Sequence, residues 1–224
     1  DNGEIVTIEG NTHKNCGKSI ENETETAYLE RWNRDGKAVY SQDLFLDKIL
    51  SFIRANKDKP FFLFHPTQLP HGPVAIPAVH PELANNPELT PIEKEYASMV
   101  KLLDDNVGAI MNELRRLGLD KNTVVIFASD HGETMCSQRT EDPKNSPYSE
   151  SMNIPFIVRF PGKIQPGVDD LLLSSPDIMP TVLGLCGLGD SIPAEVQGRN
   201  FAPLFYDEKA EIVRPTGALY IQNL

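Results

Sequence analysis

Apolar residues recur at helical spacing in two long stretches of the chain. In residues 39–55 they stand at Leu46, Ile49, Leu50 and Ile53, and the polar run that ends at Pro60 closes this helix. The second stretch opens with the capping box Thr90-Pro91-Ile92-Glu93 and closes at Gly118. Its stripe predicts one long helix packed on a core and comprises Tyr96, Met99, Val100, Leu103, Val107, Ile110, Met111, Leu114 and Leu117.

Short apolar runs rich in β-branched and aromatic residues separate these helices and predict strands. They are residues 61–64, 124–127 and 155–160, with a further short candidate at 171–173. Residues 124–127 do not alternate with polar ones, which is typical of a parallel strand covered on both faces. A helix follows from Ser175 through Cys186. This order of elements predicts an α/β layered fold with a largely parallel sheet.

The start of the chain shows little periodicity. Residues 1–36 are polar and predict loop and edge structure, with one candidate strand at residues 4–8. Cys16-Gly17-Lys18-Ser19 is similar to a phosphate-binding loop but lacks the upstream glycine spacing and a preceding strand, so it is read as coincidence. We therefore expect a loop-rich entry segment at 1–36, an α/β domain at 37–206 and a C-terminal extension at 207–224.

An acid and an imidazole stand side by side where the strand at 124–127 ends. Asp130 and His131 precede Gly132, which allows a sharp turn, and side chains at the carboxyl end of a buried strand commonly form sites. Together they suit a divalent cation. Asp130 capping a following helix beside a surface His131 is the alternative interpretation.

Two long loops hold further candidates. His71 lies in a loop stiffened by Pro70 and Pro73, and Lys144 lies in the polar stretch at 132–153. Loops of this length in a compact domain are often functional, although a plain surface histidine and a solvated lysine are the alternatives. Asp104 and Asp105 lie beside the helical stripe and are expected to be solvated.

Composition narrows the classes of partner. The 224 residues carry a formal net charge of -11, which argues against a nucleic-acid partner. There is no apolar run long enough to span a bilayer and no charged-then-apolar leader, so no membrane partner is expected. The cysteines at 16, 136 and 186 are scattered and fit neither a zinc spacing nor a disulfide framework.

Taken together, the order and spacing of these segments resemble the later part of the sulfatase pattern. The resemblance spans roughly residues 37–206 and rests on Lys59 to Leu63, Pro70-His71, Tyr96 to Leu117, Asn122 to Glu133, Lys144 to Tyr148, Ile154 to Gly162 and Asp177 to Gly187. It implies the α/β sandwich of the alkaline-phosphatase-like superfamily, built around a mixed sheet and incomplete here.

The resemblance also implies roles for single residues. Asp130 and His131 match a pair that binds a divalent cation, usually Ca²⁺, whereas the imidazole would equally suit Mn²⁺ or Zn²⁺. His71 and Lys144 match the residues that hold the sulfate oxygens and assist the leaving group. The family implies hydrolysis of sulfate monoesters on a sulfated small molecule or glycan, in a periplasmic, secreted or lysosomal setting.

The departures from the pattern bear on activity. Sulfatases carry Cys-x-Pro-Ser-Arg, whose Cys becomes the formylglycine nucleophile, and an upstream pair of aspartates that completes the metal site. Neither is in this sequence: Cys16 and Cys136 lack the Pro and the Arg, and Asp104-Asp105 falls within a helix. We expect the C-terminal part of a sulfatase domain, inactive alone. A phosphatase, phosphodiesterase or phosphonate hydrolase of the same superfamily, or a non-catalytic binding protein, are the alternatives.

Overall fold

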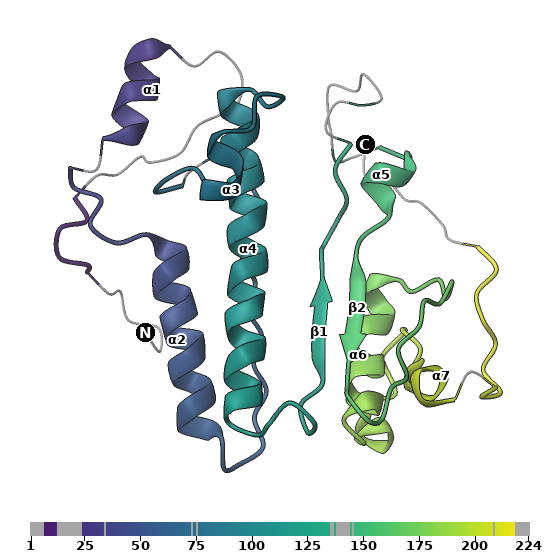
Figure 1. Ribbon diagram of the computed structural model, residues 1–224. Coiled ribbons are helices and arrows are strands. Elements are labelled where there is room, and N and C mark those ends of the chain that lie inside the picture. Colours follow the sequence, from purple (N-terminus) through teal and green to yellow (C-terminus); the bar gives the residue numbers. More distant parts are fainter. Residues whose placement is uncertain are drawn as a thin grey trace. The chain divides into compact units, whose positions relative to one another are not determined.

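A computed structural model describes residues 7–12, 24–33, 35–72, 74, 76–134, 137, 144, 146–207 and 209–217 (Figure 1). The chain divides into two compact units, Asp1–Leu119 and Asp120–Leu224. Along the described ranges, no helix is long and apolar enough to cross a membrane.

The first unit is helical. Its elements are α1 (Glu25–Trp32), α2 (Ser41–Asn56), α3 (Pro81–Ala84) and α4 (Pro91–Arg116). Both long helices α2 and α4 were predicted and are confirmed, whereas α1 falls in a segment predicted to be loop. Its sequence has no continuous apolar stripe, but the Thr24 side chain accepts the backbone N–H of Ala27 and caps the first turn.

The capping box of α4 forms as its sequence predicts. The Thr90 side chain accepts the backbone N–H of Glu93, and the Glu93 carboxylate accepts the backbone N–H of Thr90 at 2.8 Å. Gly118 follows the helix with φ of 71°, which only glycine adopts without strain. Both ends of the longest helix are therefore fixed by local chemistry.

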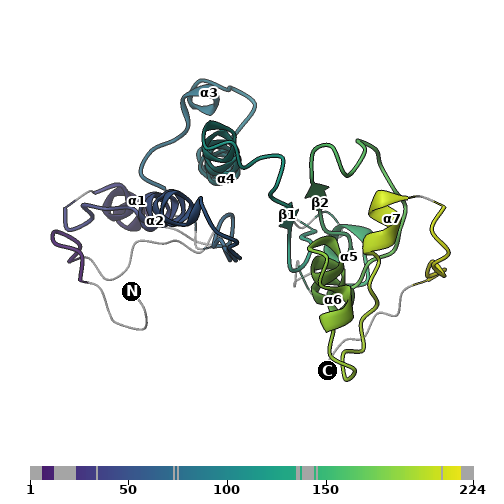
Figure 2. The same cartoon turned by 90° about the horizontal axis from the view of Figure 1, so that it is seen from below.

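The core of the first unit lies between α4 and the loop that precedes α3. Leu69, Val74, Ile76 and Met99 are buried together, with Tyr96 and Leu103 among the side chains packed against them. An ion pair ties α2 to α4: Glu113 Oε1 accepts from Arg54 Nε at 2.7 Å. Figure 2 shows α3 against α4, where the loop returns to the long helix.

The strand predicted at residues 61–64 is not present as such, and this prediction was wrong. Neither helix nor strand forms there, and no described residue pairs with the segment to form a sheet. Strand character in the sequence is local, whereas a ladder needs a neighbouring strand that supplies hydrogen bonds.

The second unit contains a two-stranded sheet. Strands β1 (Val125–Ala128) and β2 (Phe156–Arg159) confirm two predicted strands, but their pairing is antiparallel, with Val125 opposite Arg159 and Ala128 opposite Phe156. The sequence predicted β1 as a parallel strand. Within the described residues its pairing is antiparallel instead. Residues 171–173 form no ladder, so the strand proposed there was also wrong.

Helices complete the second unit. They are α5 (Ser149–Met152), α6 (Ser175–Leu185) and α7 (Ala202–Tyr206), with a 3₁₀ turn at Gly189–Ser191. The predicted α6 is confirmed, but its cap is Ser174, whose hydroxyl donates to Asp177 at 2.8 Å. The other oxygen of Asp177 accepts the backbone N–H of Arg199 at 2.8 Å, which holds the chain leading into α7 against α6.

Candidate functional site

Asp130 and His131 lie just beyond the carboxyl end of β1, as the sequence predicts. Asp130 Oδ1 accepts the backbone N–H of His131 at 3.0 Å and the hydroxyl of Ser129 at 3.4 Å. The Asp130 side chain is 88% exposed, so its second oxygen is accessible. No helix follows directly, which removes the interpretation of Asp130 as a helix cap.

The environment of Asp130 favours its ionised form. Burial acts to raise the pKa of the carboxyl, but hydrogen bonds from the backbone of Asp130 and His131, with the charge of His131, outweigh it and lower the pKa. The group is a carboxylate at neutral pH, which is the form that binds a cation.

One nitrogen of the His131 imidazole lies near the Asp130 carboxylate. Its Nδ1 lies 2.7 Å from the carbonyl oxygen of Gly132. Because a carbonyl only accepts, Nδ1 carries a proton, so Nε2 is the ring nitrogen that can offer a lone pair to a cation. Nε2 lies 3.8 Å from Asp130 Oδ1, so a carboxylate and an imidazole nitrogen converge. Metal-binding histidines typically donate a hydrogen bond from the nitrogen that does not bind the metal, because this bond fixes the orientation of the ring.

Backbone hydrogen bonds join the segment after His131 to α5. The backbone N–H of Glu133 donates to the carbonyl oxygen of Glu150 at 2.8 Å, and a similar bond joins Gly132 to Ser151. A Cβ on Gly132 would stand 2.1 Å from the Glu150 carbonyl oxygen. Glycine is thus required here by close approach of two backbones rather than by its torsion angles.

Ser151 connects this segment to Lys144. Its hydroxyl is almost fully buried, donates to the carbonyl oxygen of Lys144 and accepts the backbone N–H of Ser146 at 3.5 Å. The backbone of Lys144 is therefore held close to the turn that carries Asp130 and His131. Sequence reasoning missed Ser151, because a serine in a polar loop gives no signal by itself.

His71 lies in the first unit, in an exposed turn where its backbone N–H donates to the Gln68 carbonyl oxygen at 2.8 Å. Its Nδ1 contacts the carbonyl oxygen of Gly72 and, because a carbonyl only accepts, carries a proton. Asp130, His131 and Lys144 belong to the second unit. The sequence predicts that these three residues and His71 lie around one cleft at the carboxyl ends of neighbouring strands, and this stays a prediction.

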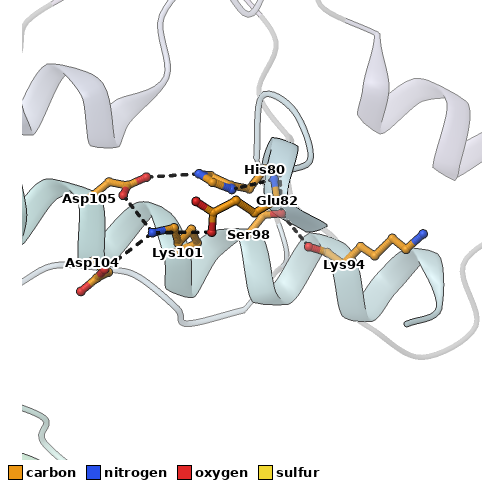
Figure 3. Close-up of polar contacts among 7 residues, drawn as sticks. All are labelled: His80, Glu82, Lys94, Ser98, Lys101, Asp104 and Asp105. Carbon is orange, nitrogen blue, oxygen red and sulfur yellow. Dashed lines mark hydrogen bonds and ion pairs between the residues drawn. The ribbon is translucent and has the colours of Figure 1, made fainter. Parts of the chain in front are cut away.

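A polar cluster on α4 was not predicted. His80 caps α3, accepting the Glu82 backbone N–H on Nδ1 at 3.3 Å, so its Nε2 carries the proton toward Asp105, 3.4 Å away (Figure 3). Lys101 lies 3.4 Å from the other oxygen of Asp105. Asp104 and Asp105 are exposed, as expected, and nothing in their surroundings indicates catalysis. The contacts of the cluster attach the loop before α3 to α4. His80 followed by a proline was the signal in the sequence.

The metal site is incomplete in the part of the chain that the structure describes. Within those ranges no group of three or more His, Cys, Asp and Glu side chains converges. The sequence segments at Cys16 and Cys136 lie outside the described residues. Asp130 and His131 thus offer two donors of the kinds that a divalent cation accepts, and further ligands have to come from elsewhere.

Comparison with known proteins gives one consistent result. Residues 8–188 match the protein-family model for sulfatases. The chain is 56% identical over 221 residues to an endo-4-O-sulfatase of Bacteroides thetaiotaomicron, covering 86% of this chain and 44% of that protein. It is 33% identical to the N-acetylgalactosamine-6-sulfatase of Rattus norvegicus over 77% of this chain and 36% of that one.

A solved structure of a similar protein has a similar fold. A Bacteroides thetaiotaomicron protein studied for the metabolism of multiple glycosaminoglycans superposes with a TM-score of 0.71 at 58% identity. The match covers 80% of this chain and 42% of that one. The chain therefore spans less than half the length of the relatives it matches.

Proposed function

This chain belongs to the sulfatase family, and on that premise we propose that it forms the cation- and sulfate-binding part of a carbohydrate sulfatase. The predicted family and the α/β, alkaline-phosphatase-like fold class are confirmed by the same likenesses. The proposed reaction is hydrolysis of a sulfate monoester, and the 56% identity to an endo-4-O-sulfatase supports a 4-O-sulfated glycan as the ligand.

One observation carries the proposal: the turn with Asp130 and His131 is joined through Ser151 to Lys144. These contacts support the proposal that the Asp130 carboxylate, the His131 imidazole and the backbone that carries Lys144 belong to a single region at the end of β1. Sulfate ester cleavage places negative charge on the sulfate oxygens and on the departing oxygen, and cationic groups around them stabilise that charge.

The donor set fits a divalent cation. The Asp130 carboxylate and Nε2 of His131 would hold Ca²⁺, with Mn²⁺ or Zn²⁺ as the alternatives that imidazole favours. When bound, such an ion supplies a Lewis-acid charge to the ester. Lys144 binds a sulfate oxygen through its ammonium group, and His71 serves the departing oxygen.

The chain does not bring a nucleophile of the family type. Covalent catalysis needs an activated nucleophile, and the Cys-x-Pro-Ser-Arg motif is absent from the 224 residues. Binding without turnover is therefore the behaviour that we propose for this chain by itself.

Calorimetric titration with a 4-O-sulfated oligosaccharide tests this function, with the unsulfated oligosaccharide and an aryl phosphate as comparisons. We expect the sulfated glycan to bind and Lys144→Ala to weaken the binding by roughly ten- to a hundredfold, because a hydrogen bond to a charged group contributes about 1.5 to 3 kcal/mol. Lys121→Ala removes an exposed lysine of the same unit and should leave binding unchanged. Equal affinity for sulfated and unsulfated glycan would refute the proposal, and preference for the phosphate would favour a phosphatase.

A further inference from the structure

His80 is bonded to α3 and to α4 through different atoms, and all of these contacts lie within the first unit (Figure 3). Its backbone N–H donates to the hydroxyl of Ser98 at 2.8 Å, and the buried Ser98 donates in turn to the carbonyl oxygen of Lys94 at 2.6 Å. The ring accepts the backbone N–H of Glu82 on Nδ1 at 3.3 Å, and its Nε2 lies 3.4 Å from Oδ2 of Asp105. One residue thus begins α3 and attaches it to the long helix.

The two contacts of the ring respond to protonation in opposite ways. In the neutral ring Nδ1 accepts and Nε2 donates, so both contacts are satisfied. The imidazolium has no acceptor, so its Nδ1–H would face the N–H of Glu82, and the cap of α3 is lost. The positive charge would also lie beside the N–H groups that open a helix, where it is unfavourable. Toward Asp105, by contrast, the same charge adds attraction.

The charged side chains around His80 determine which group of the cluster titrates near neutral pH. On α3 and α4 they are Glu82, Lys94, Lys101, Asp104 and Asp105. Carboxylates ordinarily change charge near about pH 4 and lysines near about pH 10, whereas histidines do so between about pH 5 and 8. Lys101 lies 3.4 Å from Oδ1 of Asp105, and the hydrogen bond with Asp105 raises the pKa of Lys101, so this lysine stays charged. Within this set of side chains, the imidazole is therefore the group that changes its charge near neutral pH.

We propose that His80 is a pH-sensitive cap, which holds the first turn of α3 when the ring is neutral and releases it when the ring is protonated. Residue 80 itself stays on α4, because the bond to Ser98 does not titrate and the attraction to Asp105 grows. The change is therefore confined to residues 81–89, between His80 and the capping box that begins at Thr90. The switch does not depend on the proposed function, so either can fail without the other.

Nuclear magnetic resonance of the full chain, titrated from about pH 8 to about pH 5, tests the proposal. At the upper end we expect the His80 ring to carry its proton on Nε2. As the pH falls, the amide proton of Glu82 should lose its hydrogen-bonded chemical shift, and the Cα shifts of α3 should move toward coil values with the same midpoint as the ring. An α3 that stays capped down to the lower end, or a neutral ring with its proton on Nδ1, would overturn the inference.

A variant without a titratable cap separates this switch from other effects of acid. His80→Asn keeps a side chain that caps helices but gains no charge, so α3 should stay capped over the whole range. His65→Asn, at another histidine of the first unit, should leave the transition of α3 unchanged. A transition that persists in His80→Asn would contradict the proposal.

Two neighbouring charges should shift the midpoint in opposite directions. Asp105→Asn removes an attraction for the imidazolium and should lower the midpoint by about half a pH unit or more, whereas Lys101→Gln removes a repulsion and should raise it. Shifts of the same sign, or no shift in either variant, would show that the transition does not arise from the His80 ring. If a variant fails to fold, the titration of the original chain still decides whether α3 is released.

Discussion

The backbone N–H of Gly132 donates to the carbonyl oxygen of Ser151 at 2.9 Å. Because the hydroxyl of Ser151 donates to the Lys144 carbonyl oxygen, one buried serine holds both the turn with Asp130 and His131 and the segment with Lys144. The predicted effects of changes at Gly132 and Ser151 follow from this arrangement.

Gly132→Ala should destabilise the second unit. The added Cβ would stand 2.1 Å from the Glu150 carbonyl oxygen, so one of the two backbones has to move. We expect a loss of about 1 to 3 kcal/mol in the free energy of unfolding, measured by urea denaturation. Gly167→Ala is the matched control, because a Cβ there meets nothing within 4 Å. Equal stability of the two variants would show that the close approach is not real.

Ser151→Ala removes the hydroxyl that joins Lys144 to the site. It leaves the Lys144 carbonyl oxygen and the Ser146 N–H without this partner, at a cost of about 1 to 3 kcal/mol. Affinity for the sulfated oligosaccharide should fall as well, because Lys144 is no longer held near Asp130. Ser149→Ala, at an exposed serine of the same helix, should change neither quantity. A normal affinity in Ser151→Ala would contradict the positioning role.

Glu113 should make stability depend on pH in the acid range. Hydrogen bonds from Arg116 and Arg54 lower the pKa of its carboxyl from 4.5 to about 2. A depressed pKa in the folded state stabilises the protein above pH 4.5, and this contribution is lost as the pH falls toward 2. The stability difference between the original chain and Glu113→Gln should therefore shrink over that window. Glu88→Gln, at an exposed glutamate, should give a flat difference; a flat difference for Glu113→Gln would be the contrary result.

Calcium should bind the chain only weakly. Asp130 and His131 provide two ligands, whereas Ca²⁺ takes about six to eight oxygens. We expect calorimetry to give a dissociation constant above about 1 mM, the weak end of calcium sites in proteins. Micromolar binding that is lost in Asp130→Asn would mean that this chain completes the site by itself.

Sequence patterns predicted those elements whose stability is local. The capping box at Thr90 and Glu93 and the stripe of α4 are short-range signals, and they gave the right helix. Residues 61–64 and 171–173 were expected as strands because strand propensity is visible locally, but a ladder depends on a partner far away in the chain. For the same reason the antiparallel pairing of β1 with β2 was not foreseen.

In the candidate site, too, local sequence signals were predictable and contacts between distant residues were not. Asp130 and His131 were predicted because a strand that was expected to be buried ends beside them, and the structure brings their donor atoms to within 3.8 Å although β1 is only half-buried. Ser151 was not predicted, because its hydroxyl and its carbonyl oxygen contact the backbone at residues 144 and 132, which are distant from it in the local sequence pattern. The role of His71 remains a prediction from the family resemblance.

Hydrolysis of an aryl sulfate by the purified chain tests most directly whether it is the binding part of a sulfatase without the nucleophile. We predict no turnover above background, with or without added Ca²⁺, and no difference between the original chain and Lys144→Ala. The parallel binding titration shows that the same preparation is folded and competent. Turnover well above background that falls in Lys144→Ala would contradict this and show that the 224 residues carry the chemistry by themselves.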